Sequence, residues 1–324
     1  FPAMPILRRT LLGSLALPAL ARAQTGWVPD RATRLVVPFA PGGSQDVLGR
    51  LFAQAILAGT GQQMVVENRA GAGGILGGEA VARGPADGLS LLLATAGQTT
   101  IPKAIGRRMP YDPETDLAPV MQLLDSPVAL LAGPNVPVTD AASLIALARS
   151  TPTPLPYAST GIGTNTHLIM EDLKAREHLN VEHVPYRGAA AAFNDLLAGR
   201  IALMFVSVPS VLGFSGGALK VMATTGAHRF PSLPEVPTLT EGAVPGFTAS
   251  IWTGLCVRAG TPAAAVAYWQ EAFTKAMAEP ALRQRLDGLG VTPAPSDPAA
   301  FGSMMQDDLA RWRRVVAPLN INLD

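Results

Sequence analysis

Two glycine-rich turns are the places where this sequence is best suited to bind a ligand. Ala40 to Ser44 follows the apolar run Leu35 to Phe39, and Thr160 to Asn165 follows Leu155 to Ala158. Each turn leads into a segment of helical period. Glycine lets backbone amides approach a ligand, and the first turn of a helix offers unpaired N–H groups with a partial positive charge. Because such a terminus binds an anion without an arginine, the sequence predicts two anion-binding turns.

The first turn also has a purely structural interpretation. It is then a plain turn in which Ser44 is the N-cap and Asp46 is a favourable acid in the first helical turn. Asp46 itself has three interpretations: an acid pointing to solvent, a partner for a ligand amine or hydroxyl, or one half of a carboxylate pair for acid–base chemistry. His167, after the second turn, is expected to pack or cap rather than contact the ligand. Two such turns facing one cleft favour a ligand with two acidic groups, or one acid and a hydrogen-bonding tail.

A third glycine cluster spans Gly71 to Gly74 and continues with Gly77 and Gly78. It lacks the Gly-Lys-Ser/Thr ending of a P-loop, and no ribose-binding acid follows in a clean second strand. We therefore expect close packing of a helix on a sheet here, and a wall of the cleft, rather than a nucleotide site.

The carboxyl edge of the predicted sheet supplies further candidates, since open α/β sheets bind ligands there. Thr95 to Gly97 end one predicted strand, and Ser207 follows another. The residues predicted to bind the ligand are Phe39, Ala40, Gly42, Gly43, Ser44, Asp46, Thr95, Ala96, Gly97, Ser159, Thr160, Gly161, Gly163, Thr164, Asn165 and Ser207.

Several function classes are disfavoured by composition. The 25 Lys and Arg residues nearly balance 24 Asp and Glu residues without a run of like charge, so no nucleic-acid partner is expected. Cys256 is the single cysteine and lies in an apolar stretch, where a buried thiol is expected. The four histidines lack ligand spacing, so we predict no metal site. No Gly-x-Ser-x-Gly motif is present, and we predict no catalytic residues.

Short apolar runs alternate with segments of helical period, which predicts an α/β fold with a mostly parallel sheet. The predicted strands are Leu35 to Phe39, Met64 to Glu67, Leu89 to Thr95, Val128 to Ala132, Leu155 to Ala158, Ile201 to Val206 and Ile251 to Val257. Helices are predicted from Asp46 to Gly59, from Asn165 to Glu177, through Phe193 to Leu197, and from Pro262. In the last of these, Val266, Trp269, Phe273 and Met277 share one face and are expected in the core.

Breaks rich in Pro and Gly at Gly133 to Pro137 and around Pro231 to Gly246 separate a middle block from its flanks. The 324 residues suffice for two domains. We predict a discontinuous lobe one of residues 24–130 plus 250–324 and a lobe two of residues 131–249, an arrangement that suits hinge closure.

The amino terminus has the pattern of a secretory signal. Arg8 and Arg9 precede the apolar run Leu11 to Leu20, and Ala21 and Ala23 are small residues where a signal peptidase cuts. The run is about half of the roughly 20 residues that span a bilayer. We predict a signal peptide over residues 1–23 and a periplasmic protein, exported by either the general or the twin-arginine route.

Six motifs in order resemble the Bug proteins, the extracytoplasmic receptors of tripartite tricarboxylate transporters. They are Val37 to Asp46, Glu67 to Gly74, Pro110 to Pro113, Ala158 to Thr164, His183 to Gly188 and Pro234 to Thr238. The resemblance covers nearly all of the chain after the signal. One departure is Ala70, where relatives often carry glycine or proline.

The resemblance implies a type II periplasmic-binding-protein fold with two lobes, mixed mostly parallel sheets and helices on both faces. It implies no cofactor and a ligand that is a carboxylic acid, an amino acid or a nicotinic-type acid. In that family the turns matching Ala40 to Ser44 and Gly161 to Asn165 hold the carboxylate, partly through water. The implied partners of this expected monomer are the membrane subunits of a transporter. A receptor that signals to a membrane sensor, or an exported enzyme acting on a small carboxylate, stays open as an alternative.

Overall fold

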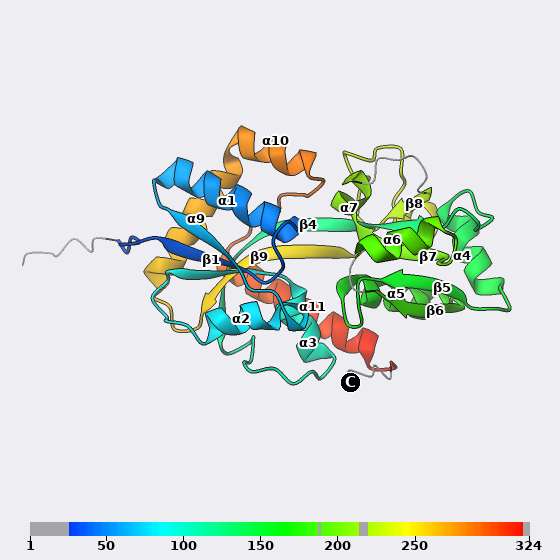
Figure 1. Cartoon of the computed structure of the whole chain (residues 1–324), viewed down its shortest axis with the longest axis horizontal. Coiled ribbons are helices and arrows are strands. Elements are labelled where there is room, and N and C mark those ends of the chain that lie inside the picture. The colour runs from blue at the N-terminus through cyan, green and yellow to red at the C-terminus, as the bar shows by residue number, and fades with distance from the viewer. Residues whose placement is uncertain (1–25, 187–188, 214–219, 320–324) are drawn as a thin grey trace, which may run out of the picture.

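The computed structural model describes residues 26–186, 189–213 and 220–319, so the predicted signal peptide lies outside the described residues. An extended sheet runs through two lobes (Figure 1) in the strand order β2-β1-β3-β9-β4-β7-β5-β6, and β8 also pairs with β4. The strands are β1 (Thr33–Val37), β2 (Met64–Asn68), β3 (Ser90–Ala94), β4 (Leu117–Ala132), β5 (Leu155–Ser159), β6 (Val181–Pro185), β7 (Leu203–Ser207), β8 (Lys220–Thr224) and β9 (Ser250–Arg258). The chain therefore has the predicted α/β architecture.

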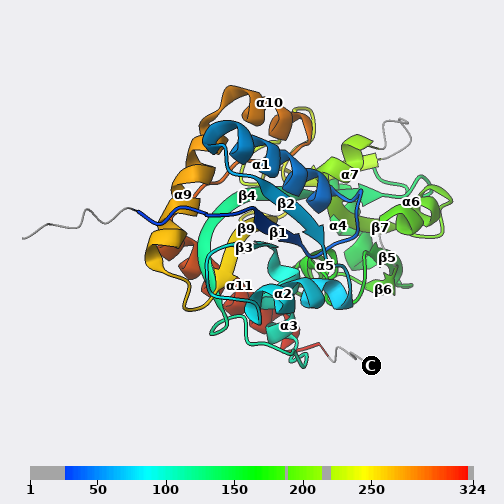
Figure 2. The same ribbon diagram turned by 60° about the vertical axis from the view of Figure 1, so that its left-hand side comes forward.

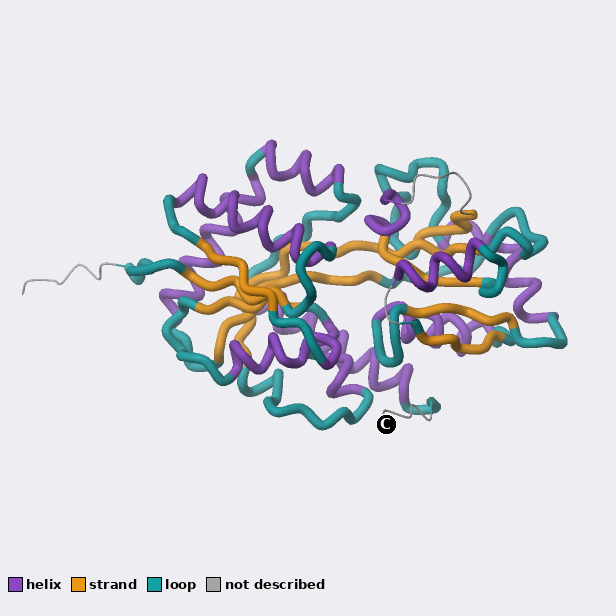
Figure 3. The backbone as a smooth tube through the Cα atoms, in the orientation of Figure 1, coloured by secondary structure: helices purple, strands orange, loops and turns teal. Residues whose placement is uncertain are grey.

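Strand β4 carries the chain from one lobe into the other (Figure 3). Between Leu117 and Pro127 it pairs with β9, and from Val128 to Ala132 it pairs with β7 and β8. The first crossing thus lies inside a strand and not in the Gly133 to Pro137 break, which follows it. Apolar residues of β4 are buried on both sides of the crossing, so the strand continues from one core into the next.

Helices cover both faces of the first lobe's sheet, as Figure 2 shows. Leu35 and Val37 of β1 pack in one cluster with α1 and α9, whereas Val36 packs in another with α2. This alternation follows from the two-residue period of a strand. The elements of this lobe are α1 (Ser44–Thr60), η1 (Ala72–Gly74), α2 (Ile75–Ala82), η2 (Ala96–Gln98), α3 (Thr100–Ala104), α9 (Ala263–Ala278) and α10 (Pro280–Gly288).

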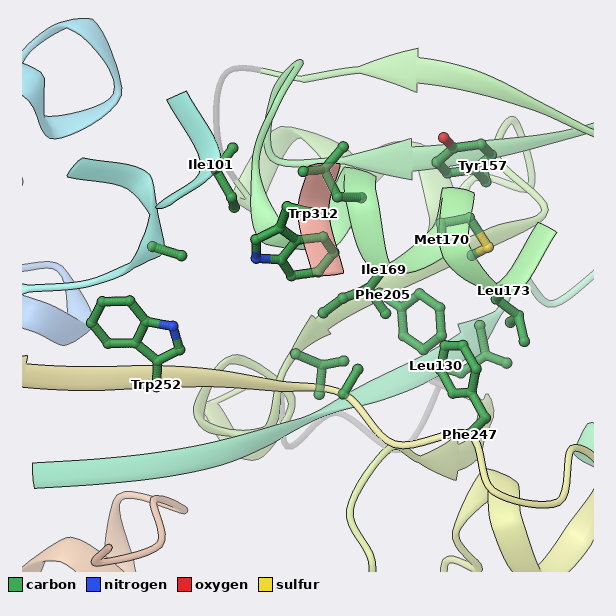
Figure 4. Packing of buried hydrophobic residues seen from close by; sticks show 14 of the residues in the cluster. Ile101, Leu130, Tyr157, Ile169, Met170, Leu173, Phe205, Phe247, Trp252 and Trp312 are labelled. Carbon is green, nitrogen blue, oxygen red and sulfur yellow. The ribbon is translucent and has the colours of Figure 1, made fainter. Parts of the chain in front are cut away.

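The second lobe and the C-terminal helix share a core with the first lobe. Figure 4 shows Trp312 of the C-terminal helix in one cluster with Ile101 of α3 and Ile169 of α5. On that helix Arg311 also donates to Asp172 of α5 across 2.8 Å. The remaining helices are α4 (Ala141–Ser150), α5 (Asn165–Glu177), α6 (Ala189–Leu197), α7 (Val208–Gly213), α8 (Leu239–Gly242) and the C-terminal α11 (Pro298–Val316). Helix α11 therefore ties the two lobes together.

Core predictions agree with the structure at several points. Trp269, Phe273 and Met277 are buried on one face of α9, and Cys256 is buried within β9. Close packing by the third glycine cluster is confirmed, because a Cβ on Gly77 would lie 2.6 Å from Cβ of Pro38. Pro262 is the N-cap of α9 rather than its first residue.

Candidate functional site

Strand directions place the two glycine-rich turns on edges that face each other. β1 and β3 are parallel, β9 is antiparallel to β3, and β4 is antiparallel to β9, so β1 and β3 run in the direction of β4, toward the second lobe. β7 is antiparallel to β4 and β5 is parallel to β7, so both run back toward the first lobe. The carboxyl ends of β1 and β3 therefore face those of β5 and β7 across the point where β4 crosses (Figure 1).

The first turn joins β1 to α1 and is held by Asp46. The carboxylate accepts hydrogen bonds from the Gly42 amide (2.9 Å), from Nδ2 of Asn68 (2.9 Å) and from Nε of Arg50 (3.0 Å). The Arg50 guanidinium, followed by the Gly42 amide, lowers the pKa of Asp46 to about 2. Because the side chain is 5% exposed, the interpretation of Asp46 as an acid pointing to solvent is wrong. The ionised carboxylate of Asp46 therefore fixes the backbone of the turn by accepting a hydrogen bond from the Gly42 amide.

Beyond the Gly42 amide, which donates to Asp46, the start of α1 has no side-chain cap. Gly42 has a φ of +82°, and Gly43 is the N-cap of α1 with no side-chain cap. The prediction of Ser44 as N-cap is therefore wrong, because Ser44 is already helical and exposed. Asn68 also donates to the Phe39 carbonyl over 3.1 Å, a support that the sequence analysis missed. Its only local signal is its place at the end of β2.

The second turn joins β5 to α5 and is held by hydroxyl groups. Oγ of Ser159 accepts from the Gly161 amide at 3.1 Å, and Oγ1 of Thr164 donates to the Gly161 carbonyl at 2.8 Å. The Thr160 amide donates to Oγ1 of Thr166 over 3.2 Å. Gly161 and Gly163 have φ values of +140° and +71°, which favour glycine. Ser159 is fully buried, so its hydroxyl supports the turn from within.

A stack of aromatic rings lies beneath the second turn. His167 and His183 stack with ring centroids 3.9 Å apart, and Tyr157 lies 5.0 Å from His183 on β6. Nδ1 of His167 accepts from the Gly163 amide at 3.1 Å, and Nε2 of His183 lies 2.7 Å from Oγ of Ser159. Burial lowers the pKa of both histidines to about 4. His167 packs and caps, as expected, whereas the sequence analysis did not identify His183 as a support.

The predicted residues at the end of β3 form a compact support. Oγ1 and the amide of Thr95 donate to Oε1 of Gln98, at 3.0 and 2.8 Å. Thr95 and Ala96 are buried, and a Cβ on Gly97 would lie 3.2 Å from the Gly73 carbonyl. The structure thus brings the third glycine cluster and the end of β3 together, on the edge that also carries the first turn.

The last predicted residue, Ser207, lies at the end of β7, on the edge of the second lobe that faces the first turn. On the second lobe, Ser207 pairs with Val128 of β4, and its Oγ lies 2.8 Å from Oγ of Ser210. Among the described residues no hydrogen bond joins the first turn to the second. At the two helix starts, Oε1 of Gln45 and Nδ2 of Asn165 are buried without a hydrogen-bond partner in the described part of the chain.

Residues 26–186, 189–213 and 220–319 contain neither a candidate metal centre nor a helix suited to span a membrane. In these ranges no three or more His, Cys, Asp or Glu side chains are grouped so as to hold a metal ion. None of the helices described there has the length and apolar character needed to cross a membrane.

Known proteins resemble this chain in sequence and in fold. Residues 48–321 match the model of the tripartite tricarboxylate transporter family receptor. Protein BugT of Bordetella pertussis is 32% identical over 89% of each chain. The structure of R. palustris Rpa4515 with adipate is 32% identical with a TM-score of 0.81, covering 89% of this chain and 97% of that one. MatC from Rhodopseudomonas palustris with bound malate is 30% identical with a TM-score of 0.76, covering 89% and 100%.

Proposed function

The chain belongs to the tripartite tricarboxylate transporter receptor family, and we propose that it captures a small carboxylate between its two lobes. The family and its structural neighbours are solute-binding receptors rather than enzymes. We further propose that this protein works in the periplasm as a monomer and delivers its ligand to membrane transporter subunits without turning it over. The lobes would be residues 24–130 plus 250–324 and residues 131–249, with the signal peptide at residues 1–23.

The observation that carries this proposal is that two helix starts without side-chain caps, those of α1 and α5, lie on edges that face each other. The first turns of α1 and α5 follow strands whose carboxyl ends face each other, and backbone amides at both points are available to an anion. Gln45 and Asn165 add a buried unpaired acceptor and donor at the same two helix starts. Since buried polar groups are nearly always paired, a ligand or water between the lobes would satisfy them.

The chemistry of the neighbours supports a carboxylate. Rpa4515 has a structure with adipate, and MatC has one with malate. In this chain we propose that Ala40 to Ser44 and Gly161 to Asn165 meet the ligand through those backbone amides that do not already donate to protein groups. The proposed support residues are the buried side chains of Asp46, Thr95 and Ser159, together with Ala96. Phe39, Gly97 and Ser207 stay proposed as the rim of the site.

Thermal shift of the purified protein against organic acids, amino acids and nucleotides tests the proposal. We expect one or more acids to raise the midpoint of unfolding, because a ligand that binds only the folded state stabilises it. A flat response to every acid with a clear shift for a nucleotide, or measurable turnover of the acid, would contradict the proposal.

Gly43→Val is the variant that places the ligand at the first turn. Gly43 has a φ of −76°, and an added Cβ would meet only the Ala40 carbonyl at 3.5 Å, so the fold should tolerate the change. A bulky side chain among the amides should abolish carboxylate binding. Gly59→Val near the other end of α1 is the control, because a Cβ there meets nothing within 4 Å. Equal affinities in both variants would place the pocket elsewhere.

A further inference from the structure

A short segment after α3 lies between the two lobes. A Cβ on Gly163 of the second turn would lie 3.0 Å from Cδ1 of Ile105, so this segment touches the second lobe's turn. Two residues further on, Nη1 of Arg107 would lie 3.7 Å from a Cβ on Gly73. Gly73 in turn packs against Gly97 at the end of β3. The segment therefore spans from the third glycine cluster to the second turn.

Arg107 differs from most cationic residues of this edge, because its charge is not paired with any described residue; its neighbour Arg108 is also unpaired there, but only the Arg107 guanidinium lies beside Gly73. Arg50 bonds to Asp46, Arg69 to Glu67, and Lys103 to Asp112 and Glu114. Arg107 is exposed and has no hydrogen bond or ion pair from its guanidinium to any described residue. Its backbone is nonetheless fixed, since its amide donates to the Pro102 carbonyl at 2.8 Å. Arg107 thus presents an unpaired guanidinium beside Gly73 from a backbone that is fixed by a hydrogen bond.

The surface below this guanidinium is bare backbone. Apart from Nη1 of Arg107, nothing lies within 4 Å of a Cβ placed on Gly73. Gly97 beside it also lacks a side chain. A ligand group that rests on this strip meets the planar fork of Arg107, a geometry that matches a carboxylate and can bind it through two parallel hydrogen bonds.

We propose that Arg107 binds a second acidic group of the ligand and so makes this receptor selective for diacids over monoacids. This inference rests on the proposed function and adds to it that the amides of the two turns together hold one carboxylate of the ligand. Those amides carry only partial charges. The full charge of Arg107 is then what distinguishes a ligand with two carboxylates from one that ends in a methyl group.

Calorimetric titration with two matched pairs of acids tests this inference. Adipate is compared with hexanoate, and malate with 2-hydroxybutyrate, because each monoacid replaces one carboxylate of its diacid by a methyl group. The natural sequence should bind at least one diacid more tightly than its monoacid. In Arg107→Gln the affinity for that diacid should fall roughly 10- to 100-fold, the usual range for a lost charge-assisted hydrogen bond, while monoacid binding stays the same.

Arg108→Gln is the matched control, since Arg108 is the exposed neighbour and also has no ion pair among the described residues. It should keep the preference for the diacid. A diacid preference that survives in Arg107→Gln, or equal binding of both members of each pair by the natural sequence, overturns the role of Arg107 and leaves carboxylate capture intact. Failure of every acid in the wider panel overturns the proposed function itself. Unchanged circular dichroism of the variant confirms that it is folded.

Discussion

The two turns that open α1 and α5 share a backbone design but are held by opposite chemistry. An ionised carboxylate holds the first, since Asp46 has a pKa of about 2 and accepts from the Gly42 amide. Neutral groups hold the second, where Ser159 accepts from one amide and His167 from another. The charge of Asp46 is balanced by Arg50, so neither turn offers the ligand an unbalanced side-chain charge. At the two turns themselves, we therefore propose that an anion is bound by the backbone.

Because of this difference, the supports of the two turns lose their stabilising effect at different pH values. Asp46 has a folded-state pKa below its ordinary value, so its stabilising contribution is complete above about pH 4 and is lost as the pH falls through 2. His167 and His183 have folded-state pKa values near 4, below the ordinary 6.5. As the pH falls, the unfolded chain binds protons at these histidines before the folded chain does. The free energy of unfolding therefore decreases from pH 6.5 to 4. Acid therefore loosens the second turn before the first.

Asp46→Ala is the largest test of this comparison. The change removes the acceptor of the Gly42 amide and of the Asn68 side chain, and it leaves Arg50 unpaired. We expect a loss of about 3 kcal/mol in the free energy of unfolding, the upper range for bonds to a charged group. Urea unfolding at pH 7 measures it.

The control for this variant is Asp297→Ala at the start of α11. There an exposed carboxylate accepts one amide bond, from Ala300 at 2.7 Å, so a loss of about 1 kcal/mol is expected. If Asp46→Ala costs no more than Asp297→Ala, the carboxylate is an ordinary helix cap and does not hold the first turn.

The pH dependence of unfolding is the second test of this comparison. Between pH 6.5 and about 4 each buried histidine should remove up to about 1.4 kcal/mol of stability per pH unit. The groups around the pair are Tyr157, Glu171 and Lys174. Lys174 lowers both pKa values, and Glu171 raises that of His183. Burial is the largest cause for both histidines, so both pKa values stay below 6.5. Urea unfolding at pH 7, 5.5 and 4.5 measures the slope.

His167→Gln identifies the source of that slope. Its amide oxygen can still accept from Gly163, but it does not titrate, so the slope should become shallower. His228→Gln is the control, because His228 is exposed and should leave the slope unchanged. An identical slope in the natural sequence and in His167→Gln would assign the acid sensitivity to other groups.

Local signals predicted the turns, but their supports come from other strands. The helix from Asn165 to Glu177 was predicted with the bounds of α5; Gly161 and Gly163 mark its start, whereas at its end His178 adopts the left-handed conformation without a glycine signal. The first part of β4 was missed, since Pro119, Gln122 and Asp125 interrupt its apolar pattern and bulges shift its register. Its long pairing with β9 could not be read from local periodicity.

The same limit applies to the candidate site. Asn68 reaches the first turn from β2, and His183 reaches the second from β6. Each belongs to a neighbouring parallel strand, and only the strand register brings it beneath its turn. Spacing along the chain therefore predicts where the turns lie but not which side chains hold them.

Ser159→Ala gives the smallest effect and tests whether the neutral turn has one main support or several. The change removes the acceptor of the Gly161 amide and the neighbour of Nε2 of His183. Thr164 still bonds to the Gly161 carbonyl, and His167 still accepts from Gly163. A loss of about 1 to 2 kcal/mol is expected, the usual net value of one to two neutral hydrogen bonds.

The control for this last variant is Ser210→Ala, which removes one hydroxyl of the Ser207 and Ser210 pair without touching either turn. Carboxylate affinity should fall a few-fold in Ser159→Ala and stay constant in Ser210→Ala. A loss in Ser159→Ala as large as that in Asp46→Ala would mean that the second turn, like the first, depends on a single side chain. The contrast between one charged support and several neutral ones would then be wrong.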